Sequence, residues 1–244
     1  MTGLSYTRYE LLRTFRNRRF YLFSLGFPLV LYWVIAAPQR NNHDIGGTGI
    51  SFPLYYMVGL ASFGTMAAMI STGARIAGER QVGWTRQLRI SPLTSRAYFR
   101  AKVVTAYVMA LLSLALLYVS GAALGVSLSA PRWAAMTGLI LVGLLPFAAF
   151  GILIGHLVTT DSVGPIMGGL VSILAFVSGT WFPITSGFLH SFGPFLPSWW
   201  LVQASHTAIN GHGWGARGWI TVLAWAVVLA LLAAWSYRRD TGRV

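Results

Sequence analysis

Apolar residues fill long stretches of this chain, and polar residues gather in the shorter segments between them. Each apolar run is long enough for a helix to cross about 30 Å of hydrocarbon. The pattern therefore predicts six membrane-spanning helices, at about residues 20–37, 52–74, 103–126, 135–158, 163–182 and 218–237. Because no repeat or linker interrupts them, we expect residues 1–244 to form a single all-α integral membrane domain.

The segment before the first apolar run has the pattern of an amphipathic helix lying on a membrane. Leu4, Leu11, Leu12 and Phe15 share a helical stripe, and arginines lie between them. Such a helix would place its apolar side chains in lipid and its arginines near anionic head groups. The same arginines are equally explained as the ordinary basic flank of the first span.

Charge is scarce and unevenly distributed. Hydrophobic residues make up 55% of the chain and charged residues 9%, which excludes an ordinary water-soluble domain. Fifteen of the 18 basic residues precede the first predicted span, lie between the second and third, or follow the sixth. The positive-inside rule then places both termini in the cytoplasm. We expect the chain to lie in a cell inner (plasma) membrane. The net charge of +13 thus needs no nucleic acid to explain it.

One connection fits this topology less well. Residues 159–162, TTDS, join the fourth and fifth predicted spans on the cytoplasmic side but include no basic residue. A re-entrant hairpin formed by these two spans is the alternative. The excess of arginine over lysine elsewhere is typical of GC-rich bacterial genomes.

The residues that usually carry enzyme chemistry are nearly absent from this sequence. The chain has five acidic residues, none of them deep in a predicted span, which weighs against an ion-coupled carrier. It has no cysteine, its histidines match no metal-binding spacing, and it lacks the G-x-x-x-x-G-K-[ST] phosphate-binding loop. We therefore expect no catalytic, cofactor-binding or metal-binding residues, and no ATP hydrolysis by this chain alone.

The stretch GERQVGWTRQLRISPLTSRAYFRAK, residues 78–102, is the most highly charged part of the chain. Residues 79–90 predict a short helix with Trp84 and Leu88 on one face, and Pro92 would end it. An aromatic anchor with a charged rim suits a socket on another protein. A strip that binds lipid is the alternative.

Two motifs in their topological places give this sequence a family resemblance. The pattern ER..GT...L..(S/T)P is matched between the second and third spans, with Trp84 where threonine is common, by Glu79, Arg80, Gly83, Leu88, Ser91 and Pro92. SGTWFPI and LPSWW follow the fifth span and supply Gly179, Phe182, Pro183, Pro197 and Trp199. Together they resemble the membrane subunit of an ABC-2 type exporter, in which the second segment folds back as short re-entrant helices.

The resemblance implies a transport complex. Two permeases, as a homodimer or a heterodimer, would pair with ATP-binding subunits that hold ATP and Mg. A coupling helix would contact the ATPase through residues that include Glu79, Arg80, Gly83, Trp84, Leu88, Arg89 and Pro92. Glu79 is expected to pair with an arginine of the N-terminal helix, or else to be an exposed carboxylate of little consequence.

The cargo would be a hydrophobic drug, antibiotic or lipid-like molecule, as in multidrug efflux and antibiotic resistance. Methionine and aromatic side chains suit such cargo, and the predicted pathway residues are Phe63, Met66, Met69, Met167 and Phe176. Packing against lipid is the alternative for each of them. A stand-alone channel or carrier without an ATPase partner is the competing function, and a membrane anchor or assembly factor is a third.

Overall fold

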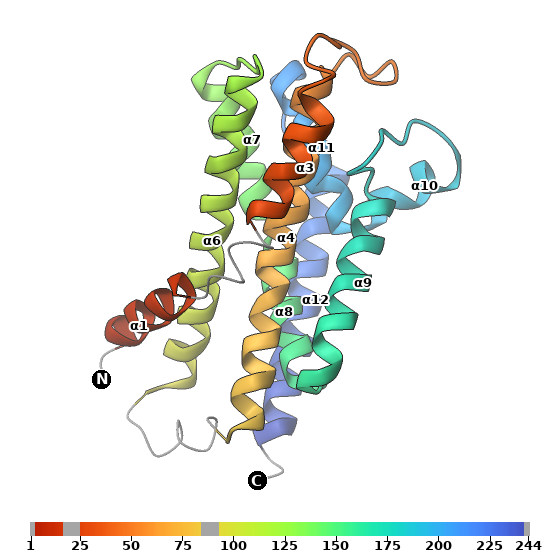
Figure 1. The fold of residues 1–244 in the computed structure, drawn as a ribbon. Helices are drawn as coiled ribbons and strands as arrows, with labels where there is room; N and C mark the ends of the chain where they lie inside the picture. The colour runs from red at the N-terminus through yellow and green to blue at the C-terminus, as the bar shows by residue number, and fades with distance from the viewer. Residues whose placement is uncertain (1–2, 17–24, 84–92, 242–244) are drawn as a thin grey trace.

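The computed structural model describes residues 3–16, 25–83 and 93–241, and these residues form helices joined by short connections (Figure 1). The elements are α1 (Gly3–Phe15), α3 (Phe27–Ala36), α4 (Phe52–Gln81), α6 (Ser95–Ala123), α7 (Ala130–Gly143), α8 (Leu145–Leu157), α9 (Thr160–Val177), α10 (Gly187–Phe192), the 3-10 helix η2 (Gly193–Phe195), α11 (Pro197–Asn210) and α12 (Ala216–Thr241). The predicted all-α class is confirmed for this part of the chain.

Among the residues that the structure describes, five helical segments are long and apolar enough to cross a membrane. They are Phe52–Gln81, Ser95–Ala123, Ala130–Leu157, Thr160–Val177 and Ala216–Arg239, and they correspond to the second to sixth predicted spans. In the region of the first predicted span, the described part is the 10-residue apolar helix α3. Because residues 17–24 lie outside the described residues, the first span stays a prediction.

Helix α4 is the centre of the bundle. It packs against α3, α6, α8, α9 and α11, and 78% of its most apolar stretch is buried. It has 30 residues, so at 1.5 Å per residue it is about 45 Å long and extends beyond a hydrocarbon layer of about 30 Å. The helix therefore continues past the predicted end at residue 74 and includes Glu79 and Arg80 in its last turns.

The end of α4 corrects the prediction of a short helix over residues 79–90. Residues 79–81 belong to α4, and Gly83 then adopts a φ of 71°, a left-handed conformation that favours glycine and stops the helix. The remainder of the predicted coupling helix lies outside the described residues. Thr94 caps the next helix, α6, because its Oγ1 accepts a hydrogen bond from the Ala97 amide at 3.3 Å.

Glycines bring α4 and α8 into backbone contact. A Cβ atom added to Gly73 would lie 2.4 Å from the carbonyl oxygen of Gly151, and one added to Gly155 would lie 2.9 Å from the carbonyl oxygen of Gly73. Gly151 and Gly155, spaced four residues apart on α8, thus form a small-residue face that lets the two helices pack closely. By contrast, an added Cβ at Gly164 or Gly168 in α9 would meet no described atom within 4 Å.

Two predicted spans differ from the helices observed. The segment predicted as 135–158 is divided at Leu144 into α7 and α8, because Pro146 in the first turn of α8 lacks the amide hydrogen needed to continue the ladder. The segment predicted as 163–182 ends at Val177, where Gly179 adopts a φ of 75°.

The segment between α9 and α12 packs against the bundle rather than forming a free loop. The Ser178 and Ser198 hydroxyls are hydrogen-bonded at 2.5 Å and join the end of α9 to α11. Trp225 of α12 donates to the carbonyl oxygen of Phe195 at 2.8 Å, which holds η2 against α12 more than two turns inside that helix. Of the residues predicted for this segment, Trp199 is 5% exposed and Phe182 is 41% exposed.

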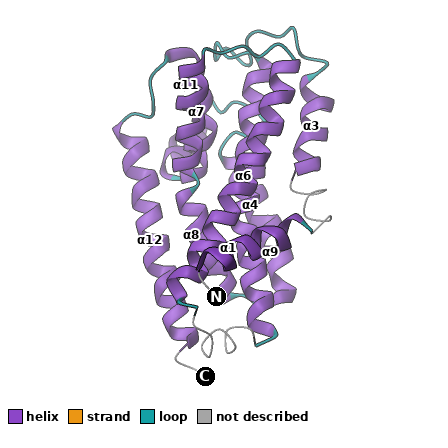
Figure 2. Ribbon diagram, turned by 90° about the vertical axis from the view of Figure 1, so that its left-hand side faces the viewer, coloured by secondary structure: helices purple, strands orange, loops and turns teal. Residues whose placement is uncertain are grey.

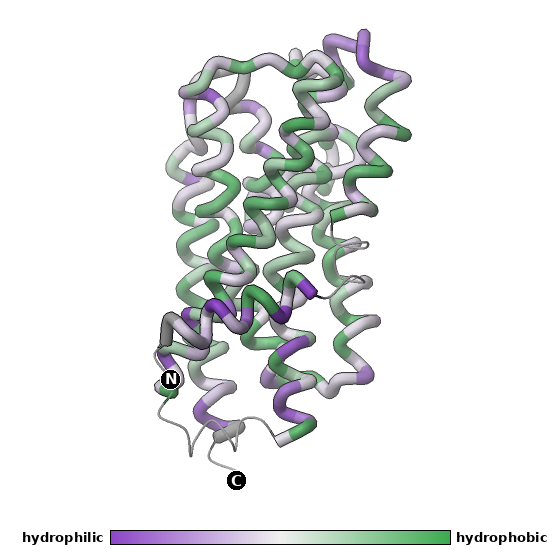
Figure 3. The backbone as a smooth tube through the Cα atoms, turned by 60° about the vertical axis from the view of Figure 1, so that its left-hand side comes forward, coloured by the Kyte–Doolittle hydropathy of each residue, from purple (hydrophilic) through white to green (hydrophobic). Residues whose placement is uncertain are grey.

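The two ends of the bundle differ in character. Helix α1 lies crosswise to α4 and α6 near one end, where the C-terminal part of α12 and the two helix ends that flank residues 84–92 also lie (Figures 1 and 2). On this side hydrophilic stretches lie in α1 and in the end of α4, and another lies at the opposite end, in the connection after α3 (Figure 3). The helices that flank residues 84–92 and the crosswise helix α1 thus meet at one end of the molecule.

Candidate functional site

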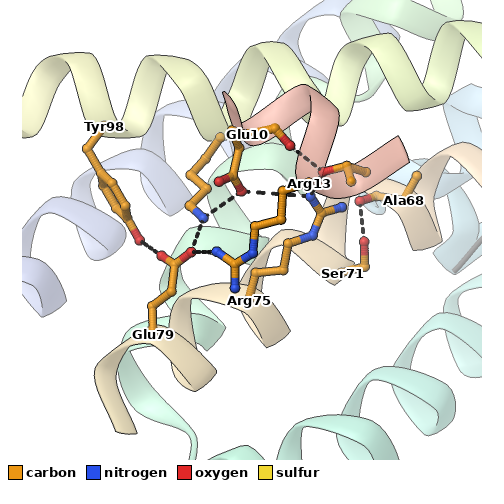
Figure 4. Close-up of polar contacts among 9 residues, drawn as sticks. Glu10, Arg13, Ala68, Ser71, Arg75, Glu79 and Tyr98 are labelled. Carbon is orange, nitrogen blue, oxygen red and sulfur yellow. Dashed lines mark hydrogen bonds and ion pairs between the residues drawn. The ribbon is translucent and has the colours of Figure 1, made fainter. Parts of the chain in front are cut away.

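Three helices contribute ionic side chains to one cluster, in which both acidic residues and the lysine are buried. Helix α1 provides Glu10 and Arg13, α4 provides Arg75 and Glu79, and α6 provides Lys102. Figure 4 shows Glu10, Arg13, Arg75 and Glu79 converging where α1 crosses the other two helices. We refer to these four residues and Lys102 as the charge cluster.

Lys102 is the centre of the charge cluster. Its Nζ lies 2.7 Å from Oε1 of Glu10 and 2.6 Å from Oε1 of Glu79, and its side chain is 1% exposed. Both carboxylates are also buried. A buried ammonium is costly unless it is paired, so Lys102 requires both α1 and α4 in their present positions.

Glu79 receives three hydrogen bonds. Arg13 donates to Oε1 at 2.8 Å, Lys102 donates to the same oxygen, and the Tyr98 hydroxyl donates to Oε2 at 2.6 Å. The predicted pair between Glu79 and an arginine of the N-terminal helix is confirmed, and the alternative of an exposed carboxylate is wrong. Burial acts to lower the pKa of Arg13, but the carboxylates of Glu79 and Glu10 raise it above its ordinary value.

Arg75 attaches α4 to α1 at a second place. Its Nη1 lies 3.8 Å from Oε1 of Glu10 and donates a hydrogen bond to the Thr14 hydroxyl. The Thr14 hydroxyl in turn donates to the carbonyl oxygen of Glu10 at 2.9 Å. The charge cluster has three basic and two acidic side chains. It holds α1 to the bundle because Glu10 of α1 pairs with Lys102, and Arg13 of α1 pairs with Glu79.

Helix α1 packs on the bundle through a face that includes polar residues, and part of its apolar stripe is exposed. Tyr6, Glu10 and Thr14 follow one another at intervals of four residues and are buried against the bundle. Leu12 and Phe15, from the predicted apolar stripe, are 53% and 47% exposed. These two members of the stripe thus face away from the protein, as expected of a helix whose outer face lies in lipid.

Of the other residues predicted for coupling, the structure describes Arg80 and Gly83. Arg80 donates through Nη1 to the carbonyl oxygen of Gly155 at 3.0 Å, which joins α4 to the end of α8. Gly83 ends α4. Trp84, Leu88, Arg89 and Pro92 lie outside the described residues, so their role stays a prediction.

The predicted pathway residues are not brought together on one surface. Met66 and Met69 are 2% and 0% exposed in the core, whereas Phe176 is 49% exposed and contacts Phe182. Phe63 packs between Phe27 and Trp181, and Met167 is partly buried against the core. A role in the pathway stays a prediction for all five.

Sequence reasoning missed the part that Lys102 and Glu10 play. Two signals pointed to them: Lys102 is the sole lysine and lies at the edge of an apolar run, and Glu10 is the sole acidic residue before the first predicted span. Rare charges beside apolar runs tend to be paired. Their partners could not be identified because 92 residues separate the two.

Known proteins resemble this chain over almost its whole length. Residues 47–235 match the family described as ABC-2 family transporter protein. The chain is 28% identical over 236 residues, covering 95% of both sequences, to the protein named "Putative transport permease YvfS" of Bacillus subtilis (strain 168). Five apolar helices of spanning length accompany these matches. This chain therefore belongs to the ABC-2 family of transporter proteins, as a permease-type membrane subunit.

Proposed function

We propose that this chain is the membrane subunit of an ATP-driven exporter whose cargo is a hydrophobic drug, antibiotic or lipid-like molecule. Family membership supports the proposal, because ABC-2 permeases generally work with an ATP-binding subunit. That subunit would hold ATP and Mg. Two permease chains, identical or paired, would form the pathway in a bacterial inner membrane.

The proposed topology has six spans with both termini in the cytoplasm. Residues 20–37, which include α3, would form the first span, and α10, η2 and α11 would be the re-entrant segment on the outer side. Residues 84–92 would contain the helix that contacts the ATP-binding subunit. The distribution of the arginines supports this orientation.

The charge cluster is the observation that carries the coupling proposal. Residues 82–94 join α4 to α6, and Lys102 of α6 is bonded to Glu79 of α4 and Glu10 of α1. Removing one partner from a buried ion pair costs about 3–5 kcal/mol. A force applied to the connection would thus displace α1, α4 and α6 together instead of bending one helix end. The cluster would be a rigid joint between the ATP-binding subunit and the spans.

Glu79→Gln tests this joint directly. The substitution keeps the shape of the side chain but removes the charge that holds Arg13 and Lys102. We expect the variant to assemble with the ATP-binding subunit and to hydrolyse ATP, but to lose the conformational response of the spans. Because the chain has no cysteine, a single Thr185→Cys substitution at the end of the bundle away from the charge cluster provides a unique thiol that reports on the conformation there. Its labelling rate is compared with and without ATP.

The matched control is Asp161→Asn, which neutralises an exposed carboxylate at the start of α9, outside the charge cluster. The control should keep the ATP-dependent change in labelling. An unchanged response in Glu79→Gln would refute the joint. A stand-alone channel or carrier, the competing function, would be favoured if the purified chain conducted ions without any ATPase.

A further inference from the structure

A cavity of about 410 Å³ lies at the end of the bundle away from α1 and the charge cluster. It is lined by the start of α4, by Ser178 at the end of α9, by α10 and η2, by α11, and by loop residues 47–48 and 183–185. Its volume is within the usual range for sites that bind small molecules. The predicted pathway residues do not line it.

The aromatic walls of the cavity are fixed in place. The Tyr55 hydroxyl donates to the carbonyl oxygen of Gly179, and Nε1 of Trp200 donates to the carbonyl oxygen of Pro194 at 3.0 Å. Trp199 packs so closely on Gly193 that a Cβ added there would lie 2.1 Å from its ring. The cavity is therefore preformed, and binding would not have to order its walls.

Three polar side chains line the cavity with unused hydrogen-bonding capacity. Gln203 and His206 lie one turn apart on α11, and His190 of α10 rests edge-on against Trp199 at 6.1 Å between ring centres. Within the described ranges 3–16, 25–83 and 93–241, none of the three makes a hydrogen bond. Burial lowers the pKa of His206, which favours its neutral imidazole. A neutral imidazole and an amide each offer both a donor and an acceptor.

The lining includes no Asp, Glu, Lys or Arg. A strongly charged ligand would lose its hydration there without gaining a counter-charge. Hydroxyl groups, which both donate and accept, are the natural complement of Gln203, His190 and His206. We propose that this cavity binds an uncharged, hydroxyl-rich group the size of a sugar ring, lying between the aromatic walls and bonded to those three side chains.

The ligand could be a free carbohydrate or the head group of a glycosylated lipid, because both present the same chemistry. Its arrival from the outer side rests on the proposed topology, whereas the binding itself does not. The test uses the full chain in phosphatidylcholine nanodiscs. Saturation-transfer NMR reports contact between the protein and the ring protons of methyl β-glucoside or hexyl β-glucoside, and empty nanodiscs give the background.

Two variants remove the site in different ways. Gln203→Leu combined with His206→Phe keeps the side-chain volumes and should weaken binding about tenfold through lost hydrogen bonds. Thr185→Trp fills the cavity from an exposed loop, so it does not endanger the fold. The control, His212→Phe, changes an exposed histidine outside the cavity lining and should bind like the parent.

If both glucosides give transfer, and if that transfer is weakened in the Gln203 and His206 variant and lost in Thr185→Trp, the ligand is a free carbohydrate. If only hexyl glucoside gives transfer, and both variants reduce it, the ligand is the head group of a membrane amphiphile. The proposal is overturned if neither glucoside binds, if the variants bind like the parent, or if methyl phosphate or choline binds equally well. No ATP-binding subunit is present, so failure here leaves the proposed transport function standing.

Discussion

At the scale of single residues, the choice of lysine at position 102 has a physical reason. The compact ammonium group lies within 2.7 Å of one carboxylate and 2.6 Å of the other while 1% of its side chain is exposed. A guanidinium is planar and larger, and its donors are fixed in a fork. Every other basic residue in this chain is an arginine. The two converging carboxylates thus account for the single exception.

Lys102→Met should destabilise the fold strongly. The substitution keeps the length of the side chain but leaves Glu10 and Glu79 buried with less compensation, at a cost of about 3–5 kcal/mol. The measurement is the thermal unfolding midpoint of the purified chain. Adding Glu10→Gln and Glu79→Gln to the variant removes the uncompensated charges and should recover part of the loss. A parental midpoint for Lys102→Met alone would contradict this account of the charge cluster.

The sequence predicted part of this site and could not predict the rest. Glu79 and an arginine of the N-terminal helix were predictable because a rare carboxylate faced a basic segment expected at the same membrane surface. The place of Lys102 between two carboxylates required knowing how α1 crosses α6. That crossing depends on packing between segments far apart in the chain, which local patterns do not encode.

At the scale of elements, the contact between α4 and α8 positions the C-terminal end of α4. The two backbones approach at Gly73, Gly151 and Gly155, where side chains would collide. Arg80 extends the contact by bonding to the carbonyl oxygen of Gly155. Helix α4 is thus held by α8 on one side and by the charge cluster on the other. Both restraints act within the last three turns of the helix.

Gly73→Ala should separate α4 from α8, whereas Gly78→Ala in the same helix should not. The added methyl at position 73 would meet a carbonyl oxygen, and overpacking of this kind costs about 1–3 kcal/mol. At position 78 no described atom lies within 4 Å of an added Cβ, so helix propensity should give a gain of up to about 1 kcal/mol. Unfolding midpoints that change equally in both variants would contradict this contact.

Helix boundaries were less predictable than helix positions. Apolar runs located the second to sixth predicted spans, because burial in lipid needs long apolar segments. The extension of α4 past residue 74 was missed because its last turns carry charges that are paired within the protein. In α1, the exposure of Leu12 and Phe15 agrees with the predicted lipid-facing stripe, whereas the burial of Glu10 and Thr14 was missed because their partners lie far away in the chain.

At the scale of the whole molecule, the two ends carry different chemistry. The end with α1 has a paired ionic cluster, and the opposite end has a cavity without charged residues in its lining. Helices α9 and α12, with 17% and 22% of their most apolar stretches buried, present wide apolar faces to lipid or to another chain. A buried ionic cluster near one end and a cavity with a neutral polar lining at the other fit the proposed function, in which the chain is driven from one side and meets ligands on the other.

The central claim is that residues 84–92 contact an ATP-binding subunit, and mild-detergent purification from native membranes tests it most directly. An ATP-binding subunit should accompany the parent chain and be lost from the variant with Trp84→Ala and Leu88→Ala. The control, Leu231→Ala with Trp235→Ala, changes the same residue types at the same spacing on the exposed face of α12 and should retain the subunit. If no ATP-binding subunit accompanies the parent, or if the Trp84 and Leu88 variant retains it, the claim is contradicted.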